Sequence, residues 1–199
     1  MYESRPLESL PARFLVVANH QSLLDIIAIM YFFRSCRRIR FVAKRELGCC
    51  VPFISSVLRV QGHALIARAG DARGAMDELS RYARRCAREG TCPVIFPEGT
   101  RSRTGELGQF YTAGLRRILE EGGSLPLLSL AVDGGWRIRG LRGMIKNLRN
   151  GIYRIKLVEV YDAPRGRKEV LEVLARCRDG IASAVSGWRP ARTHGTRIR

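Results

Sequence analysis

A histidine and an aspartate lie five positions apart in the stretch FLVVANHQSLLD, residues 14–25. The apolar run predicts a strand and the apolar residues from Leu23 predict a helix, so His20 falls on the turn between them, where α/β proteins commonly bind ligands. Such a histidine can accept a proton at neutral pH, and a carboxylate one helical turn away can hold its other nitrogen. Asp25 also fits a purely structural role, because Ser22 can cap the helix with Asp25 as its reciprocal acid. The residues alone leave both roles open.

A second stretch, FPEGTRSR, follows the apolar run PVIF. Pro97 and Gly99 favour a tight turn whose backbone amides can bind an anion. Arg101 and Arg103 add permanent positive charge suited to phosphate. Glu98 would repel a phosphate, so we expect it to hydrogen-bond an arginine, loop amides or an acceptor hydroxyl. The alternative is a solvated basic loop.

The elements that position these residues alternate between strands and helices. Residues 72–88 and 170–188 have the apolar stripe of amphipathic helices, which predicts an α/β domain with a mostly parallel central sheet flanked by helices. We expect one domain over residues 1–190 and a basic tail over residues 191–199. The predicted strands are residues 14–18, 39–43, 63–67, 93–96, 125–132 and 152–160.

Taken together, NHQSLLD and VIFPEGTRSRTGEL resemble the glycerophospholipid acyltransferase family, typified by 1-acylglycerol-3-phosphate acyltransferases. The resemblance extends from residue 14 to about residue 160. The second and fourth blocks are looser than the first and third. The four blocks, in family order, are residues 19–25, 44–68, 94–110 and 125–132.

The resemblance implies an O-acyltransferase in which His20 is the general base and Asp25 orients it. The acceptor would be a lysophospholipid, with 1-acylglycerol-3-phosphate giving phosphatidic acid, and the co-substrate would be acyl-CoA or acyl-carrier protein. No cofactor or metal is implied, and the chain has no G-x-S-x-G sequence for an acyl-enzyme. Another acceptor, such as a lyso-ornithine lipid, stays open, as does a catalytically weak lipid-binding protein. The residues implied to bind the acceptor's phosphate are Arg68, Glu98, Gly99, Thr100 and Arg101.

The chain departs from the family pattern at several positions. Ala67 replaces the acid that commonly precedes the arginine of the second block, and Ser55 stands where a glycine is common. Tyr111 and Thr112 follow the phenylalanine after which the family often has a basic residue. These departures bear on the choice of substrate more than on the histidine–aspartate pair. Taken alone, Arg68 also fits a solvated arginine at a strand end.

Composition bounds the partners and the location. The net charge is +17, and most of the excess is arginine, so the surface attracts anionic lipid, nucleic acid or phosphorylated ligands. A nucleic-acid-binding protein is the remote alternative function, but we expect no nucleic-acid partner because the sequence has no recognised binding motif. The six cysteines have no metal-site or redox spacing, which predicts reduced, partly buried thiols.

The predicted location is cytosolic with peripheral membrane attachment, since we find no signal peptide or transmembrane run in the sequence. Attachment to an anionic surface is predicted for residues 136–156, WRIRGLRGMIKNLRNGIYRIK, which hold seven bases and no acid. Their apolar residues recur at helical spacing, but two glycines make a basic loop an equal alternative.

Overall fold

The computed structural model describes residues 9–44, 64–66, 72–138 and 152–189. Its strands form one six-stranded sheet in the order β3-β2-β4-β1-β5-β6. Every pairing is parallel except that of β5 with β6, which is antiparallel. This confirms the predicted mostly parallel sheet, and each predicted strand is present. The strands are β1 (Leu15–Ala18), β2 (Ile39–Lys44), β3 (Ala64–Ile66), β4 (Cys92–Ile95), β5 (Leu127–Asp133) and β6 (Arg154–Tyr161).

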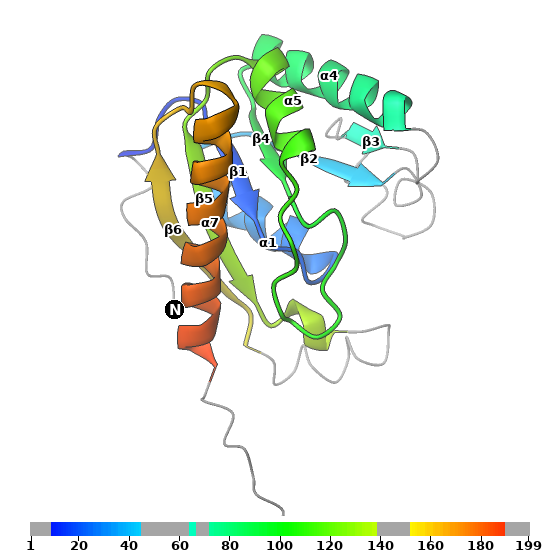
Figure 1. Ribbon diagram of the computed structural model, residues 1–199. Coiled ribbons are helices and arrows are strands. Elements are labelled where there is room, and N and C mark those ends of the chain that lie inside the picture. The colour runs from blue at the N-terminus through cyan, green and yellow to red at the C-terminus, as the bar shows by residue number, and fades with distance from the viewer. Residues whose placement is uncertain (1–8, 45–63, 67–71, 139–151, 190–199) are drawn as a thin grey trace, which may run out of the picture.

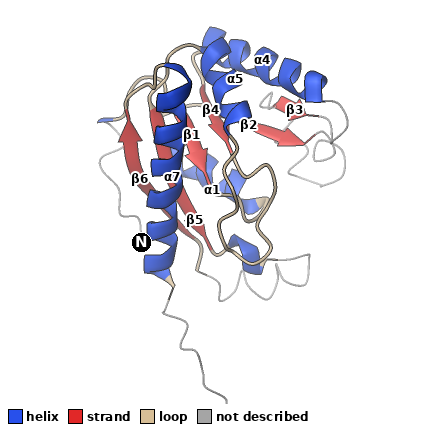
Figure 2. Cartoon of the chain, in the orientation of Figure 1, coloured by secondary structure: helices blue, strands red, loops and turns tan. Residues whose placement is uncertain are grey.

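Helices cover both faces of the sheet (Figures 1 and 2). In β1, Val16 and Ala18 point into the core shared with α1, whereas Leu15 and Val17 point into the core on the opposite face. This alternation shows why β1 is apolar throughout: a strand covered on both faces has no side for water. The helices are α1 (Leu24–Phe33) on one face and α4 (Ala72–Arg88), α5 (Thr112–Gly122) and α7 (Gly166–Trp188) on the other.

The order of the strands places a topological switch point at the carboxyl ends of β1 and β4. The two strands are neighbours, but the chain leaves β1 into α1 on one face and leaves β4 into α5 on the other. Ligands of α/β proteins commonly bind where connections diverge in this way. His20 follows β1 and Glu98 follows β4, so both predicted stretches meet at these strand ends.

Several predictions fall partly or wholly outside the described residues. Of residues 136–156, the structure describes a short 3-10 helix, η2 (Gly135–Arg137), and the start of β6. The helical alternative is therefore wrong at Arg154 and Lys156, which are in a strand because they pair with β5. The predictions that lie outside the described residues are residues 139–151, the tail at 191–199, Arg68, and the departures at Ser55 and Ala67.

The described cysteines are free thiols, as predicted. Cys86, Cys92 and Cys177 are buried, and Cys36 is partly buried. Burial is the main reason that the pKa of Cys177 rises to about 12, so this thiol is protonated at neutral pH. Among the helices in the described ranges, none has the length and apolar character to cross a membrane.

Candidate active site

His20 and Asp25 are in direct contact, as the sequence predicts. The Nδ1 atom of His20 lies 2.7 Å from Oδ2 of Asp25, whose side chain is completely buried, whereas that of His20 is 12% exposed. An ionised carboxylate only accepts hydrogen bonds, so this contact assigns the proton to Nδ1. The lone pair of Nε2 then remains available to accept a proton.

The carboxylate of Asp25 also binds the start of α1. Its Oδ2 accepts the backbone N–H groups of Gln21 at 2.6 Å and Ser22 at 2.9 Å, while Ser22 Oγ accepts the N–H of Leu24 at 3.2 Å. Only one half of the predicted capping box is therefore present: Asp25 accepts the N–H of Ser22, but Ser22 Oγ binds Leu24 and not Asp25, and the residue that caps the helix is Leu23. The side chain of Asp25 thus combines the contact with His20 and one half of the structural role.

Tyr153 is a member of this group that sequence reasoning missed. Its hydroxyl donates a hydrogen bond to Oδ1 of Asp25 from the residue just before β6. Burial, with the nearby negative charge of Asp25, holds the pKa of Tyr153 well above its ordinary value, so the hydroxyl keeps its proton. A side chain at Gly135 would collide here, because its Cβ would lie 2.8 Å from Ser22 Cβ and 3.0 Å from Asp25 Oδ1.

The loop after β4 forms hydrogen bonds with the backbone N–H and the backbone carbonyl of His20. The backbone N–H of His20 donates to Oε1 of Glu98 at 2.8 Å, and its carbonyl accepts the N–H of Ser102 at 2.7 Å. The imidazole stacks on Phe96 with ring centroids 4.0 Å apart and planes inclined by 12°. The ring is thus fixed in place and orientation before any substrate arrives.

Glu98 bonds to loop amides, one of the three kinds of partner expected for it. Its second oxygen, Oε2, accepts the N–H of Gly108 at 2.9 Å. Burial raises the pKa of Glu98 above its ordinary value, although the amides of His20 and Gly108 oppose the rise. The predicted tight turn is confirmed: the N–H of Gly99, at φ +66°, donates to the carbonyl of Phe96 at 3.0 Å. A contact of Glu98 with phosphate stays a prediction.

The predicted phosphate-binding residues beside this turn face solvent. Gly99, Thr100 and Arg101 are exposed, as is Arg103. Within the described ranges, neither arginine has a hydrogen-bond or ion-pair partner, so both guanidinium groups are available to an anion. Tyr111, which replaces the family's basic residue, is also exposed, and its backbone N–H donates to the Pro97 carbonyl at 2.9 Å.

A second layer of polar residues, also missed from the sequence, anchors the strand ends. The buried side chain of Asn19 donates to the carbonyl of Val132 at 2.9 Å and accepts its N–H at 2.8 Å, which extends the pairing of β1 with β5. Gln21 donates to Asp133 at 3.2 Å, and Arg189 donates to the same carboxylate at 2.6 Å. Burial alone would raise the pKa of Asp133, but hydrogen bonds from Arg189 and Gln21 lower it.

Fold and site together define an α/β protein with a histidine–carboxylate pair at the switch point of a mostly parallel sheet. A family model described as Acyltransferase matches residues 3–132, and the chain belongs to that family.

The relatives found by sequence share one description, 1-acyl-sn-glycerol-3-phosphate acyltransferase. The chain is 32% identical over 135 residues to such a protein from Pseudomonas aeruginosa, and the aligned segment covers 67% of this chain and 50% of that protein. It is 38% identical over 107 residues to one from Helicobacter pylori, and that aligned segment covers 54% of this chain and 43% of the relative. The chain thus spans about half the length of these curated relatives.

A solved structure supports the fold. The crystal structure of the 1-acyl-sn-glycerophosphate acyltransferase PlsC from Thermotoga maritima has a TM-score of 0.69 and 23% identity to this chain. The match covers 94% of this chain and 70% of that one.

Proposed function

We propose that this chain transfers a fatty acyl group from acyl-CoA or acyl-carrier protein to the free hydroxyl of a lysophospholipid. The preferred acceptor is 1-acylglycerol-3-phosphate, with phosphatidic acid as the product. The contact of His20 Nδ1 with Asp25 Oδ2 at 2.7 Å carries the proposal, because it leaves Nε2 as a base at the open edge of the sheet. The family and the shared description of the relatives supply the substrate class.

In the proposed reaction, Nε2 of His20 takes the proton of the acceptor hydroxyl as its oxygen attacks the thioester carbonyl. The tetrahedral intermediate collapses with cleavage of the carbon–sulfur bond, and the leaving thiolate takes the proton from the imidazolium. Asp25 stabilises the imidazolium between these steps. General-base catalysis of this kind typically contributes about 10²–10⁴-fold to the rate.

The proposed phosphate site is the turn after β4. Arg101 is exposed beside the turn at Gly99, where φ is +66°. Both residues closely follow Glu98, which accepts the backbone N–H of His20. A phosphate bound to this turn and to Arg101, with Thr100 beside it, would bring the acceptor's glycerol toward the imidazole. Arg68, outside the described residues, stays a predicted ligand of the same phosphate.

The proposed cellular setting is peripheral attachment to an anionic membrane through residues 136–156. Each base near an anionic leaflet contributes about 1 kcal/mol to such binding. Sedimentation with vesicles tests this directly. Equal binding to neutral and to anionic vesicles would exclude an electrostatic attachment.

The decisive experiment presents purified protein with acyl-CoA or acyl-carrier protein and a panel of lyso-lipids. We expect acyl transfer to 1-acylglycerol-3-phosphate by the wild type and a loss of at least about 10²-fold in His20→Ala. Transfer at an undiminished rate by His20→Ala would rule out the base. Transfer only to a lyso-ornithine lipid would retain the mechanism and change the acceptor.

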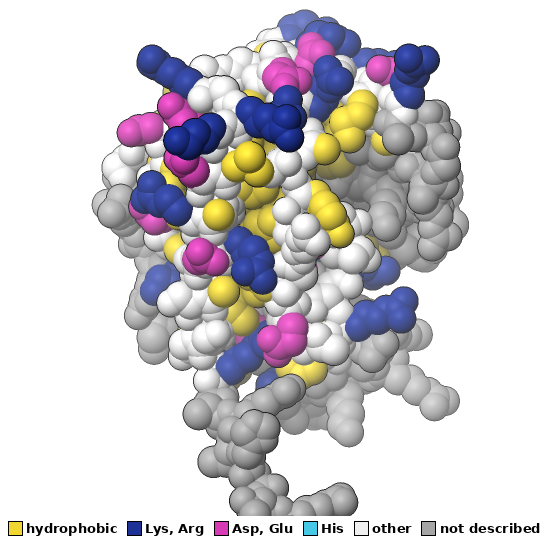
Figure 3. Space-filling model, in the orientation of Figure 1, with side chains coloured by type: hydrophobic (Ala, Val, Ile, Leu, Met, Phe, Trp, Pro, Cys, Tyr) yellow, Lys and Arg dark blue, Asp and Glu magenta, His cyan; other side chains and the backbone are white. Residues whose placement is uncertain are grey.

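On the face seen in Figure 3, the charged side chains of the described residues are of both signs, which argues against nucleic-acid binding by this face. Acidic side chains lie among the lysines and arginines on the face formed by α4, α5 and α7. One such pair, Arg84 with Glu121 at 2.7 Å, joins α4 to α5. Nucleic-acid binding instead uses a basic patch or stripe on one face.

A further inference from the structure

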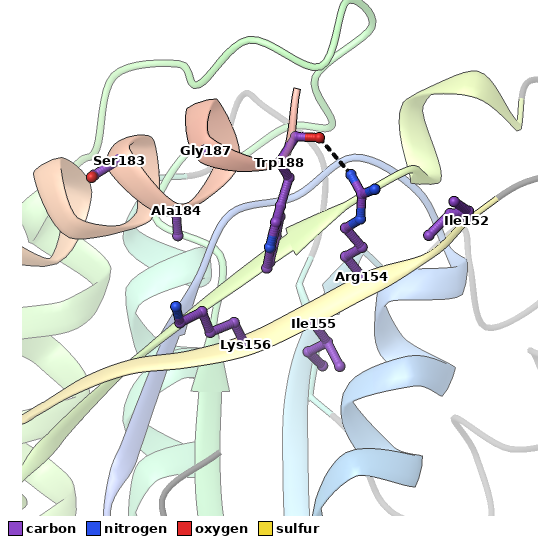
Figure 4. A pocket seen from close by; sticks show the side chains of 8 residues that line it. All are labelled: Ile152, Arg154, Ile155, Lys156, Ser183, Ala184, Gly187 and Trp188. Atoms are coloured by element: carbon purple, nitrogen blue, oxygen red, sulfur yellow. Dashed lines mark hydrogen bonds between the residues drawn. The ribbon is translucent and has the colours of Figure 1, made fainter. Parts of the chain in front are cut away.

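A hollow of about 700 Å³ lies between β6 and the C-terminal end of α7 (Figure 4). Arg154 and Lys156 line it from the strand, and Ala184, Gly187 and Trp188 line it from the helix. Figure 4 shows the Trp188 side chain reaching from the helix toward the strand between the two basic side chains. Nothing in the proposed chemistry at His20 uses this hollow.

α7 carries small residues along its side toward β6, among them Ala184 and Gly187 in the lining of the hollow. At Gly180 the two elements touch, since a Cβ there would lie 2.9 Å from Cγ1 of Val158. Two turns later, a Cβ at Gly187 would meet nothing within 4 Å. The helix and strand are therefore closely packed at one end and separated at the other.

The lining suits an anion that carries an apolar part. Arg154 and Lys156 supply positive charge, and the residues lining the hollow in the described structure include no acid. Arg154 is held in place, because its Nη1 donates to the carbonyl of Trp188 at 2.6 Å. Ile152, at the rim, is 68% exposed and provides apolar surface beside the cations. Tryptophan, isoleucine and basic side chains together are typical of a membrane–water interface.

The hollow and the histidine–aspartate pair lie at the same edge of the sheet. Arg154 pairs with Asp133 at the end of β5, and β5 pairs with β1, which leads into His20. Tyr153, next to Arg154, reaches Asp25 on the other side of the sheet. A bilayer that presents a lipid acceptor to His20 would therefore also face the hollow.

We propose that this hollow binds the phosphate headgroup of an anionic phospholipid in the bilayer, separately from the acceptor. This proposal rests on the proposed function, because a lipid acceptor for His20 would bring a membrane surface to this edge of the sheet. The phosphate lies between Arg154 and Lys156, and the glycerol and first methylenes contact Ile152 and Trp188. The headgroup thus helps hold the molecule on the membrane with His20 facing the lipid.

The test is sedimentation with vesicles of phosphatidylcholine alone or with phosphatidylglycerol. Lys156→Gln removes one charge from the hollow, and Gly187→Gln fills it with neutral atoms. Lys168→Gln is the matched control, because Lys168 is 92% exposed at the opposite end of α7. We expect anionic vesicles to bind Lys156→Gln about fivefold more weakly. Gly187→Gln should lose binding similarly, whereas Lys168→Gln should stay within twofold of the wild type.

Three results would overturn the proposal. The first is wild-type binding to anionic vesicles by both hollow variants. The second is displacement of the protein from vesicles by free coenzyme A, which would make the occupant a soluble phosphate. The third is an equal loss of kcat/KM by Lys156→Gln on a water-soluble short-chain acceptor, which would place the hollow within the acceptor site. If the wild type transfers no acyl group, the proposed function fails, but the vesicle measurements still decide the hollow.

Discussion

Replacing Tyr153 with phenylalanine removes one oxygen atom from the candidate site and keeps the ring. The lost hydroxyl is the donor to Oδ1 of Asp25, whose Oδ2 binds His20 and two backbone amides. Asp25 is completely buried, so water does not readily replace the donor. The variant therefore weakens the hold on the carboxylate that binds His20, the proposed base.

The size of the effect follows from the charge of the acceptor. A hydrogen bond to a charged group contributes about 1.5–3 kcal/mol. If this energy is used to position Asp25 and His20 in the transition state, kcat/KM falls by about 10–150-fold.

The assay is the kcat/KM of acyl transfer, and Tyr82→Phe is the matched control. Tyr82 is equally an internal tyrosine: its hydroxyl donates to the carbonyl of Arg40 at 2.7 Å and accepts the N–H of Val94 at 3.1 Å. Tyr82→Phe should lower the free energy of unfolding without lowering kcat/KM. If Tyr153→Phe retains the kcat/KM of the wild type, the hydroxyl does not position Asp25.

Other substitutions test the surroundings of the pair. Asn19→Ala leaves two buried backbone groups unpaired and should cost about 2–4 kcal/mol in urea unfolding; a loss below about 0.5 kcal/mol would contradict the strand-end role. Gly135→Ala should lower kcat/KM at least tenfold by displacing Asp25, whereas Gly122→Ala, with only an ordinary 3.5 Å contact at its Cβ, should not. Asp133→Asn should lower the free energy of unfolding at neutral pH. Because the pKa of Asp133 is lowered by folding, its stabilisation is present above about pH 3.9 and is lost as pH falls through the lower folded value. The stability difference should therefore shrink in acid, and a difference unchanged between pH 7 and 3 would exclude this linkage.

Most of the fold could be predicted because the signals are local. The strands at β1 and β5 are apolar on both faces, and the stripe that defines α4 spans seventeen residues. The helix α5 could not be predicted in this way, because it has eleven residues and buries only Leu115, Ile118 and Gly122. So short an apolar stripe carries little periodic signal.

The site could be predicted only where its contacts are short in sequence. His20 and Asp25 are five residues apart, and a strand-to-helix turn brings them together. Glu98 reaches His20 across 78 residues and Asn19 reaches Val132 across 113, so pairing of strands is what makes these contacts. No local sequence pattern shows whether Glu98 binds backbone amides or the substrate.

The edge strand β6 lies beyond the segment that the family model matches, yet residues at its start contact the candidate site. The family model ends at residue 132, yet Tyr153, which donates to Asp25, and Arg189, which holds Asp133, both follow that boundary. Among the strands of the described residues, β6 alone runs antiparallel, so its first residues return to the edge where the parallel strands end. Tyr153 therefore points to Asp25 on one face, while Arg154 and Lys156 line the hollow on the other. The segment of β6 and the residue before it, which lies outside the matched segment, thus supports the proposed catalytic pair and lines the second proposed lipid site, and alternation of side chains along it links the two.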